Sequence, residues 1–73
     1  MHTLIKYNGD KDRAIQDAKD YLGDRYDLLI SSLLAHAKDK REIRVWFAFA
    51  GVEGYPVECI IEKYFKELPD ETN

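Results

Sequence analysis

The spacing of apolar residues at intervals of three and four most constrains this fold, because it is the period of a helix with one buried face. Three stretches of the chain have it, at 11–22, 25–38 and 56–68. The apolar residues are Ala14, Ile15, Ala18, Tyr21 and Leu22 in the first, Tyr26, Leu29, Ile30, Leu33, Leu34 and Ala37 in the second, and Val57, Ile60, Ile61, Tyr64, Phe65 and Leu68 in the third. The pattern predicts a helix over each stretch.

Residues at the ends of these stretches suit helix termini. Asp10 or Asp12 can accept hydrogen bonds from the free N–H groups at the start of the first helix, and Asp24 can do so for the second. Gly23 can adopt the left-handed conformation that ends a helix, and Pro56 is allowed in the first turn of the third helix. We therefore expect the first two helices to meet at a tight corner.

Two other segments have the two-residue alternation of a β-strand. One is short and covers residues 3–7; the other covers residues 42–49. In the second, Ile43, Val45, Phe47 and Phe49 alternate with Arg44, Trp46 and Ala48. The pattern predicts a strand in each segment. The last stretch also admits a strand in which Val57, Cys59 and Ile61 alternate, but this alternative leaves Ile60, Tyr64 and Phe65 unassigned.

The predicted order of elements is β-α-α-β-α, an α+β fold in which a short antiparallel two-stranded sheet packs on helices. The 73 residues allow one domain, which we expect at 1–68, with a polar C-terminal tail at 69–73. On the open face of this sheet, Lys6, Arg44 and Trp46 would lie close together, because alternate residues of a strand point to the same side.

Cysteine content and hydropathy indicate the compartment. Cys59 is the only cysteine, so the chain cannot form an internal disulfide, and a reducing cytoplasm is its natural setting. No stretch has the pattern of a secretory leader or approaches the ~18 apolar residues of a membrane span. We expect a cytoplasmic protein that does not engage membranes.

No group of residues has the spacing of a catalytic or metal site. The candidate nucleophiles and bases are Ser31, Ser32, Thr3, Thr72, Cys59, His2 and His36. They show neither the arrangement of a nucleophile beside an oriented base nor a zinc-binding pattern. The aspartates between residues 10 and 27 are better explained as helix caps and a solvated face than as acid–base pairs. We expect no enzyme activity, metal, cofactor or small-molecule substrate.

Charge is distributed unevenly, although the net charge is only −3. Residues 38–44 carry a net +2, residues 45–73 a net −4 and residues 1–37 a net −1. The basic segment adjoins the only tryptophan, and arginine and tryptophan are enriched at the hot spots of protein interfaces. The predicted partner contacts are Lys6, Arg41, Arg44 and Trp46. The alternative is that Trp46 packs under the C-terminal helix.

The chain resembles the small transcription regulators that Xanthomonas phages encode and that bind host RNA polymerase. The resemblance is carried by the opening residues 1–10 (MHTLIKYNGD), the central residues 38–46 (KDKREIRVW), the expected β-α-α-β-α order and the lack of catalytic motifs. It covers nearly all of the chain and contains no motif that maps residue by residue, so it implies a role without assigning a contact.

What the resemblance implies is a phage-encoded protein that binds the N-terminal part of the polymerase β′ subunit in the cytoplasm of a bacterial host. Such a protein inhibits σ-dependent initiation of host transcription and promotes antitermination near the RNA exit channel, close to nascent RNA and together with the elongation factor NusA. A small rigid domain can regulate in this way by occupying a surface or by holding one conformer of its partner.

Two other functions stay open at this point. A nucleic-acid-binding module would use the same aromatic and basic residues, and its affinity would fall steeply with salt. An antitoxin or defence inhibitor would instead bind another small protein. The sequence does not distinguish this function from that of a polymerase regulator. The oligomeric state is also open.

Overall fold

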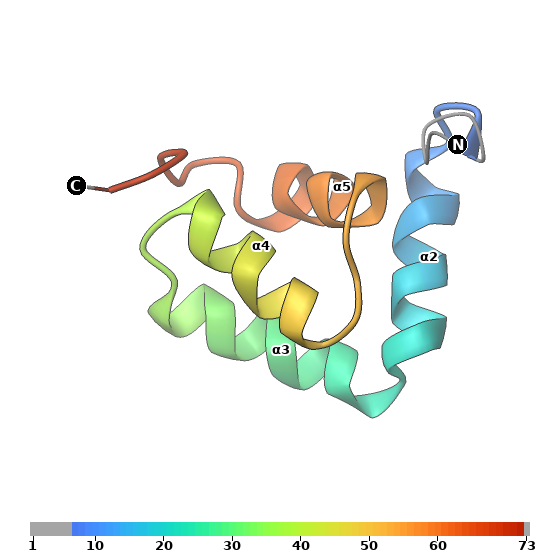
Figure 1. Cartoon of the computed structure of the whole chain (residues 1–73), viewed down its shortest axis with the longest axis horizontal. Helices are drawn as coiled ribbons and strands as arrows, with labels where there is room; N and C mark the ends of the chain where they lie inside the picture. The colour runs from blue at the N-terminus through green and yellow to red at the C-terminus, as the bar shows by residue number, and fades with distance from the viewer. Residues whose placement is uncertain (1–6, 73) are drawn as a thin grey trace.

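Four α-helices account for most of the chain in the computed structural model, which describes residues 7–72. They are α2 (Lys11–Leu22), α3 (Asp24–His36), α4 (Lys40–Phe49) and α5 (Tyr55–Tyr64). Helix α5 packs chiefly against α2 and also contacts α4, while α3 follows α2 after a sharp change of direction (Figure 1). Residues 7–72 contain no β-strand, so this part of the chain is all-α.

The prediction of an α+β fold with a two-stranded antiparallel sheet is therefore wrong. The segment predicted as the strand 42–49 is helix α4. Its two fully buried side chains, Ile43 and Phe47, are four residues apart, whereas Val45 between them is 44% exposed. In a strand all three would point to the same side. The other predicted strand, at 3–7, lies outside the described residues except for Tyr7, which takes part in no strand.

The start of α4 shows why the segment is helical. The Asp39 side chain caps the helix by accepting a hydrogen bond from the Glu42 backbone N–H, at 2.8 Å. A capping aspartate three residues before a glutamate is a recognised start signal for a helix. Helix α3 correspondingly ends at His36 and not at residue 38. Residues 37–39 are thus a connection between two helices.

The first predicted helix is confirmed as α2, with the predicted bounds. Asp10 is its N-cap and accepts a hydrogen bond from the Arg13 N–H at 3.1 Å. Gly23 ends α2 with a φ of 60°, a backbone conformation that favours glycine. The same glycine is the N-cap of α3, so the prediction that Asp24 caps this helix is wrong.

The prediction of a helix in the last stretch is confirmed over the strand alternative, although α5 is shorter than 56–68. It begins at Tyr55, has Pro56 in its first turn and ends at Tyr64. Val57, Ile60 and Ile61 are buried, which is the three-and-four spacing of a helix face. Residues after Phe65 turn back towards α4.

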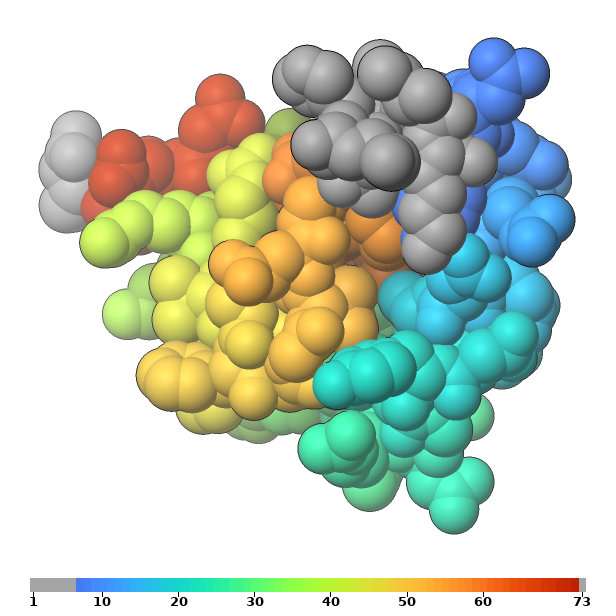
Figure 2. Space-filling view, turned by 45° about the vertical axis from the view of Figure 1, so that its right-hand side comes forward, coloured from blue at the N-terminus to red at the C-terminus, as the bar shows by residue number. Residues whose placement is uncertain are grey.

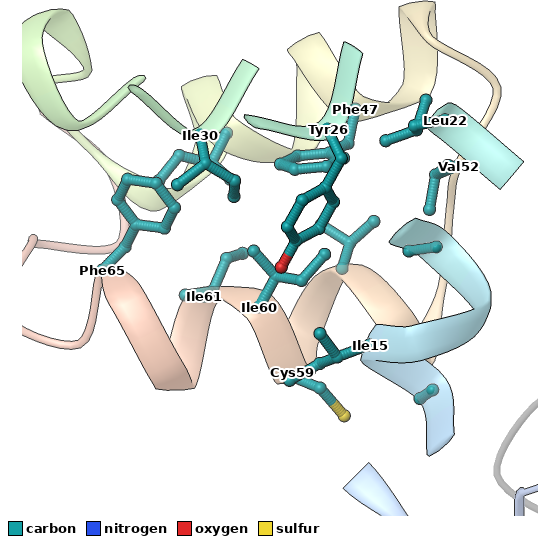
Figure 3. Packing of buried hydrophobic residues seen from close by; sticks show 14 of the residues in the cluster. Ile15, Leu22, Tyr26, Ile30, Phe47, Val52, Cys59, Ile60, Ile61 and Phe65 are labelled. Carbon is teal, nitrogen blue, oxygen red and sulfur yellow. The ribbon is translucent and has the colours of Figure 1, made fainter. Parts of the chain in front are cut away.

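The core lies where side chains from all four helices meet (Figure 3). Its largest fully buried side chains are Phe47, Ile43, Ile60 and Val57. Two of these come from α4 and two from α5, so the packing fixes α4 against the rest of the molecule. This anchoring determines which side of α4 faces solvent.

Candidate protein-binding surface

The outward side of α4 carries three neighbouring apolar side chains, Val45, Trp46 and Phe49, here called the aromatic patch. Their exposed fractions are 44%, 50% and 80%. The rings of Trp46 and Phe49 contact each other in a tilted arrangement, with centroids 6.0 Å apart and planes at 55°. In Figure 2, residues of α4 (yellow-green to yellow) lie at the molecular surface and are not covered by other segments. Clustered exposed apolar side chains of this kind mark interaction sites.

The aromatic patch stands on a fixed support. Ile43 and Phe47, on the opposite side of α4, have no exposed surface. In Figure 3, Phe47 projects into the core beside Tyr26 and Leu22. Because the buried side of α4 is held by packing, the patch is presented in one orientation. A rigid aromatic surface loses little conformational entropy on binding, which favours affinity.

Arg44 ties α4 to α5. Its guanidinium group donates two hydrogen bonds to the Glu58 carboxylate, from Nε to Oε2 at 2.7 Å and from Nη2 to Oε1 at 2.9 Å. The pair is about half exposed, with side-chain exposures of 43% for Arg44 and 49% for Glu58. Hydrogen bonding from Arg44 lowers the pKa of Glu58 below its ordinary value. This two-point geometry orients both side chains.

The other two bases at this end of α4 face the C-terminal segment. Arg41 Nε lies 3.7 Å from Glu71 Oε1, and Lys40 Nζ lies 3.8 Å from Asp70 Oδ1. The Arg41 side chain is 71% exposed, whereas that of Lys40 is 23% exposed. The net positive segment of the sequence is therefore largely neutralised in the folded chain by nearby carboxylates.

The predicted contact residues are only partly brought together. Arg44 and Trp46 would share a face of a strand, but residues two apart on a helix point in different directions. Arg44 accordingly reaches Glu58, while Trp46 contacts Phe49. Arg41 lies one turn before Val45 on the same helix. Lys6 lies outside the described residues.

Sequence reasoning missed Val45 and Phe49, because the strand interpretation assigned both to the buried side. The signal that identifies them is helical spacing: Phe49 is four residues from Val45 and three from Trp46, so the three share one face of a helix. A helical interpretation of residues 40–49 recovers the aromatic patch from the sequence alone.

The described residues considered for catalysis are dispersed, whereas His2 and Thr3 lie outside residues 7–72. Ser31, Ser32 and His36 are exposed on α3, and Cys59 is 3% exposed on α5, where burial raises its pKa. Asp20 accepts a hydrogen bond from Gln16 at 2.8 Å. Within residues 7–72, no group of three or more His, Cys, Asp and Glu side chains could hold a metal ion.

A shallow hollow of about 310 Å³ lies between α2 and the loop that follows α4. Its described lining residues are Tyr7, Asp17, Ala18, Tyr21, Gly51, Val52, Glu53 and Pro56. Tyr21 closes one side of it by lying over Gly51, where a β-carbon would come within 2.8 Å of the tyrosine hydroxyl. These residues include no serine, cysteine or histidine, so they supply no ordinary nucleophile beside a base.

Comparison with known proteins finds no match: no family model, no curated protein and no solved structure is similar to this chain. Across residues 7–72, none of the helices has the length and apolar content required to cross a bilayer.

Proposed function

We propose that this chain is a non-enzymatic, phage-encoded regulator that binds bacterial RNA polymerase at its β′ subunit through the aromatic patch of α4. The observation that carries the proposal is the exposure of Val45, Trp46 and Phe49 on a helix whose other side is anchored in the core. An exposed tryptophan next to a second aromatic residue is the composition of an interface hot spot.

The pairing of the basic side chains favours a protein partner over nucleic acid. Arg41 and Lys40 face Glu71 and Asp70, and Arg44 is bound by Glu58. A protein that binds nucleic acid strongly needs several unpaired cations along one surface, because phosphate neutralisation supplies most of the affinity. Among residues 7–72, the cations of α4 beside the aromatic patch do not provide such a surface.

The identity of the partner rests on the resemblance to the Xanthomonas phage regulators. The β-α-α-β-α order no longer supports it, because the structure has no sheet in residues 7–72. What remains is the likeness in residues 1–10 and 38–46. The second of these segments includes the start of α4 and ends at Trp46, in the aromatic patch.

In the proposed mechanism the chain acts in the host cytoplasm by covering part of the polymerase. Occupation of a β′ surface disfavours the conformers that engage σ at promoters, and near the RNA exit channel, together with NusA, it disfavours intrinsic termination. The size of each effect equals the difference in affinity of the chain for the states that it binds. No chemical step is needed.

The test is the affinity of the purified chain for bacterial core polymerase in about 0.1 M salt, measured alongside σ-dependent transcription from a host promoter. We expect binding and inhibition by the wild-type chain. Each of Trp46→Ala and Phe49→Ala should weaken binding, with Trp46→Ala costing at least about 2 kcal/mol, or roughly thirtyfold in affinity.

Leu28→Ala is the matched control, because Leu28 is 70% exposed on a different helix, α3. It should bind within about twofold of the wild-type chain. Absence of polymerase binding by the wild-type chain would remove the proposed partner. Equal weakening by Leu28→Ala and Trp46→Ala would remove the aromatic patch as the binding surface.

A further inference from the structure

The C-terminal segment 69–72 folds back onto the start of α4. The Lys40 N–H donates to the Pro69 carbonyl at 2.9 Å, and the Arg41 N–H donates to the Asp70 carbonyl at 3.1 Å. These are two of the first four N–H groups of the helix, which have no partner within a helix. The segment thus supplies acceptors to two N–H groups that have none within α4.

Asp39 joins this segment to the helix. Its Oδ1 accepts from the Glu42 N–H at 2.8 Å, and its Oδ2 accepts from both the N–H and the hydroxyl of Thr72, at 2.9 and 2.8 Å. The residue is only 7% exposed. One carboxylate therefore caps α4 with one oxygen and holds the C-terminal segment with the other.

Charge reinforces the same contact. The side chains of Asp70 and Glu71 approach those of Lys40 and Arg41, at 3.8 and 3.7 Å. Exposed ion pairs at such distances contribute little by themselves. Together with the four hydrogen bonds from backbone and hydroxyl groups, they place every described residue from 69 to 72 in contact with the first turn of α4 or its cap.

We infer that residues 69–72 form a latch on α4, held by the donation of Thr72 to Asp39, and that opening the latch loosens the first turn of α4 and frees Lys40 and Arg41. Removal of the Thr72 contact would leave only two backbone hydrogen bonds and two weak ion pairs to hold the segment. Negative charge at position 72 opens the latch, since a second anion beside the nearly buried Asp39 carboxylate is repelled.

The latch matters for the aromatic patch, and this consequence alone rests on the proposed function. Arg41 lies one helical turn before Val45. With the latch closed, Glu71 faces Arg41 and partly neutralises the edge of the patch. With the latch open, Arg41 is left as an unpaired cation at that edge. The chain can in this way adjust the charge of its binding surface without changing the core.

The test is backbone amide hydrogen exchange on the full-length chain, compared among the wild type, Thr72→Val, Thr72→Glu and Asp39→Asn. Thr72→Val removes only the hydroxyl donor, and Thr72→Glu adds charge. Asp39→Asn keeps a good helix cap but places an amide donor opposite the Thr72 donors. We expect exchange of the Lys40 and Arg41 amides to rise at least about threefold in Thr72→Val and at least about tenfold in Thr72→Glu.

A second readout follows the side chains. In the wild type, Lys40 should react with an amine-acylating reagent more slowly than the exposed Lys66. In Thr72→Glu, Lys40 should react at least about threefold faster than it does in the wild type. Ser32→Glu, which adds the same charge to the exposed side of α3, is the control and should change neither readout.

The α2 amides should exchange at wild-type rates in every variant, which separates opening of the latch from general unfolding. Thr72→Ser, which keeps the hydroxyl donor, should retain slow exchange at Lys40 and Arg41. Unchanged exchange at these two amides in both Thr72→Glu and Asp39→Asn would overturn the inference. None of these measurements requires a partner, so failure of the latch and failure of polymerase binding are distinguishable.

Discussion

Phe47 and Phe49 are two residues apart and have opposite environments. Phe47 has no exposed surface and projects into the core, whereas Phe49 is 80% exposed and contacts Trp46. The difference arises from the helical period, which places residues two apart on different sides of α4. The Phe47 ring therefore contributes to stability, whereas the Phe49 ring is available for binding.

Alanine substitution should separate these roles. Phe47→Ala removes a fully buried ring and should lower the free energy of unfolding by about 3–5 kcal/mol. Phe49→Ala removes an exposed ring and should change it by no more than about 0.5 kcal/mol. The measurement is urea-induced unfolding followed by circular dichroism. Equal destabilisation by the two substitutions would indicate that both rings face the core, as in a strand, and would contradict the helical assignment of residues 40–49.

At the scale of the element, three independent contacts hold α4: the buried residues Ile43 and Phe47, the Arg44–Glu58 pair and the C-terminal segment. The first uses the hydrophobic effect, the second a bidentate charge pair and the third hydrogen bonds to the start of the helix. Arg44 therefore has a structural partner within the chain. A binding experiment on Arg44 must be interpreted together with Glu58.

A double-mutant cycle on this pair should show the tie between α4 and α5. Arg44→Ala and Glu58→Ala should each lower the free energy of unfolding by about 0.5–1 kcal/mol, because the pair is half exposed. The double variant should lose less than the sum, leaving a coupling energy of about 0.5 kcal/mol or more. Urea unfolding of the four chains gives this value. Strict additivity would mean that the two side chains do not interact in solution.

The elements differ in how well the sequence predicts them. In α2 the apolar residues fit only the helical period, and its bounds are predicted correctly. In α4, Ile43, Val45, Phe47 and Phe49 fit the strand period, although only two of the four are buried. The decisive signal is the Asp39–Glu42 spacing of a capping box, which marks a helix start and outweighs the alternation.

The same error limited the prediction of the candidate site. Residue type identifies Trp46 as a candidate contact, but strand geometry groups Arg44 with it, and in the helix Arg44 reaches Glu58 instead. Some contacts join segments that are distant in the sequence. Thr72 and Asp39, which are joined by hydrogen bonds, are 33 residues apart in the chain. No local pattern in a single sequence specifies such a pair, because tertiary packing decides it.

At the scale of the whole molecule, several carboxylates make stability depend on acid pH. Hydrogen bonds from the Glu42 and Thr72 N–H groups lower the pKa of Asp39, and pairing with Arg44 and Lys11 lowers the pKa values of Glu58 and Glu62. A lowered pKa in the folded state favours folding above the unfolded-state pKa. That contribution is lost as the pH falls through the lowered value.

We therefore expect the contribution of these carboxylates to the free energy of unfolding to be constant above about pH 5. It should decline as the pH falls through the ordinary pKa values of 4.5 for glutamate and 3.8 for aspartate, and should keep declining below them. Urea unfolding at a series of pH values gives the curve. Asp39→Asn should show a shallower decline. A wild-type stability that is unchanged between pH 6 and about pH 3 would contradict these pairings.

Under the proposed function the chain acts on the polymerase through the aromatic patch, and Trp46 reports on this surface because it is the only tryptophan in the sequence. The direct measurement is the ¹⁹F NMR spectrum of the chain labelled with 5-fluorotryptophan, recorded with and without bacterial core RNA polymerase. We predict one resonance that is sensitive to solvent in the free chain, as its 50% exposure requires, and that shifts or broadens and loses this sensitivity on binding. A polymerase-bound chain whose Trp46 resonance stays at the free position and remains solvent-sensitive would contradict the account.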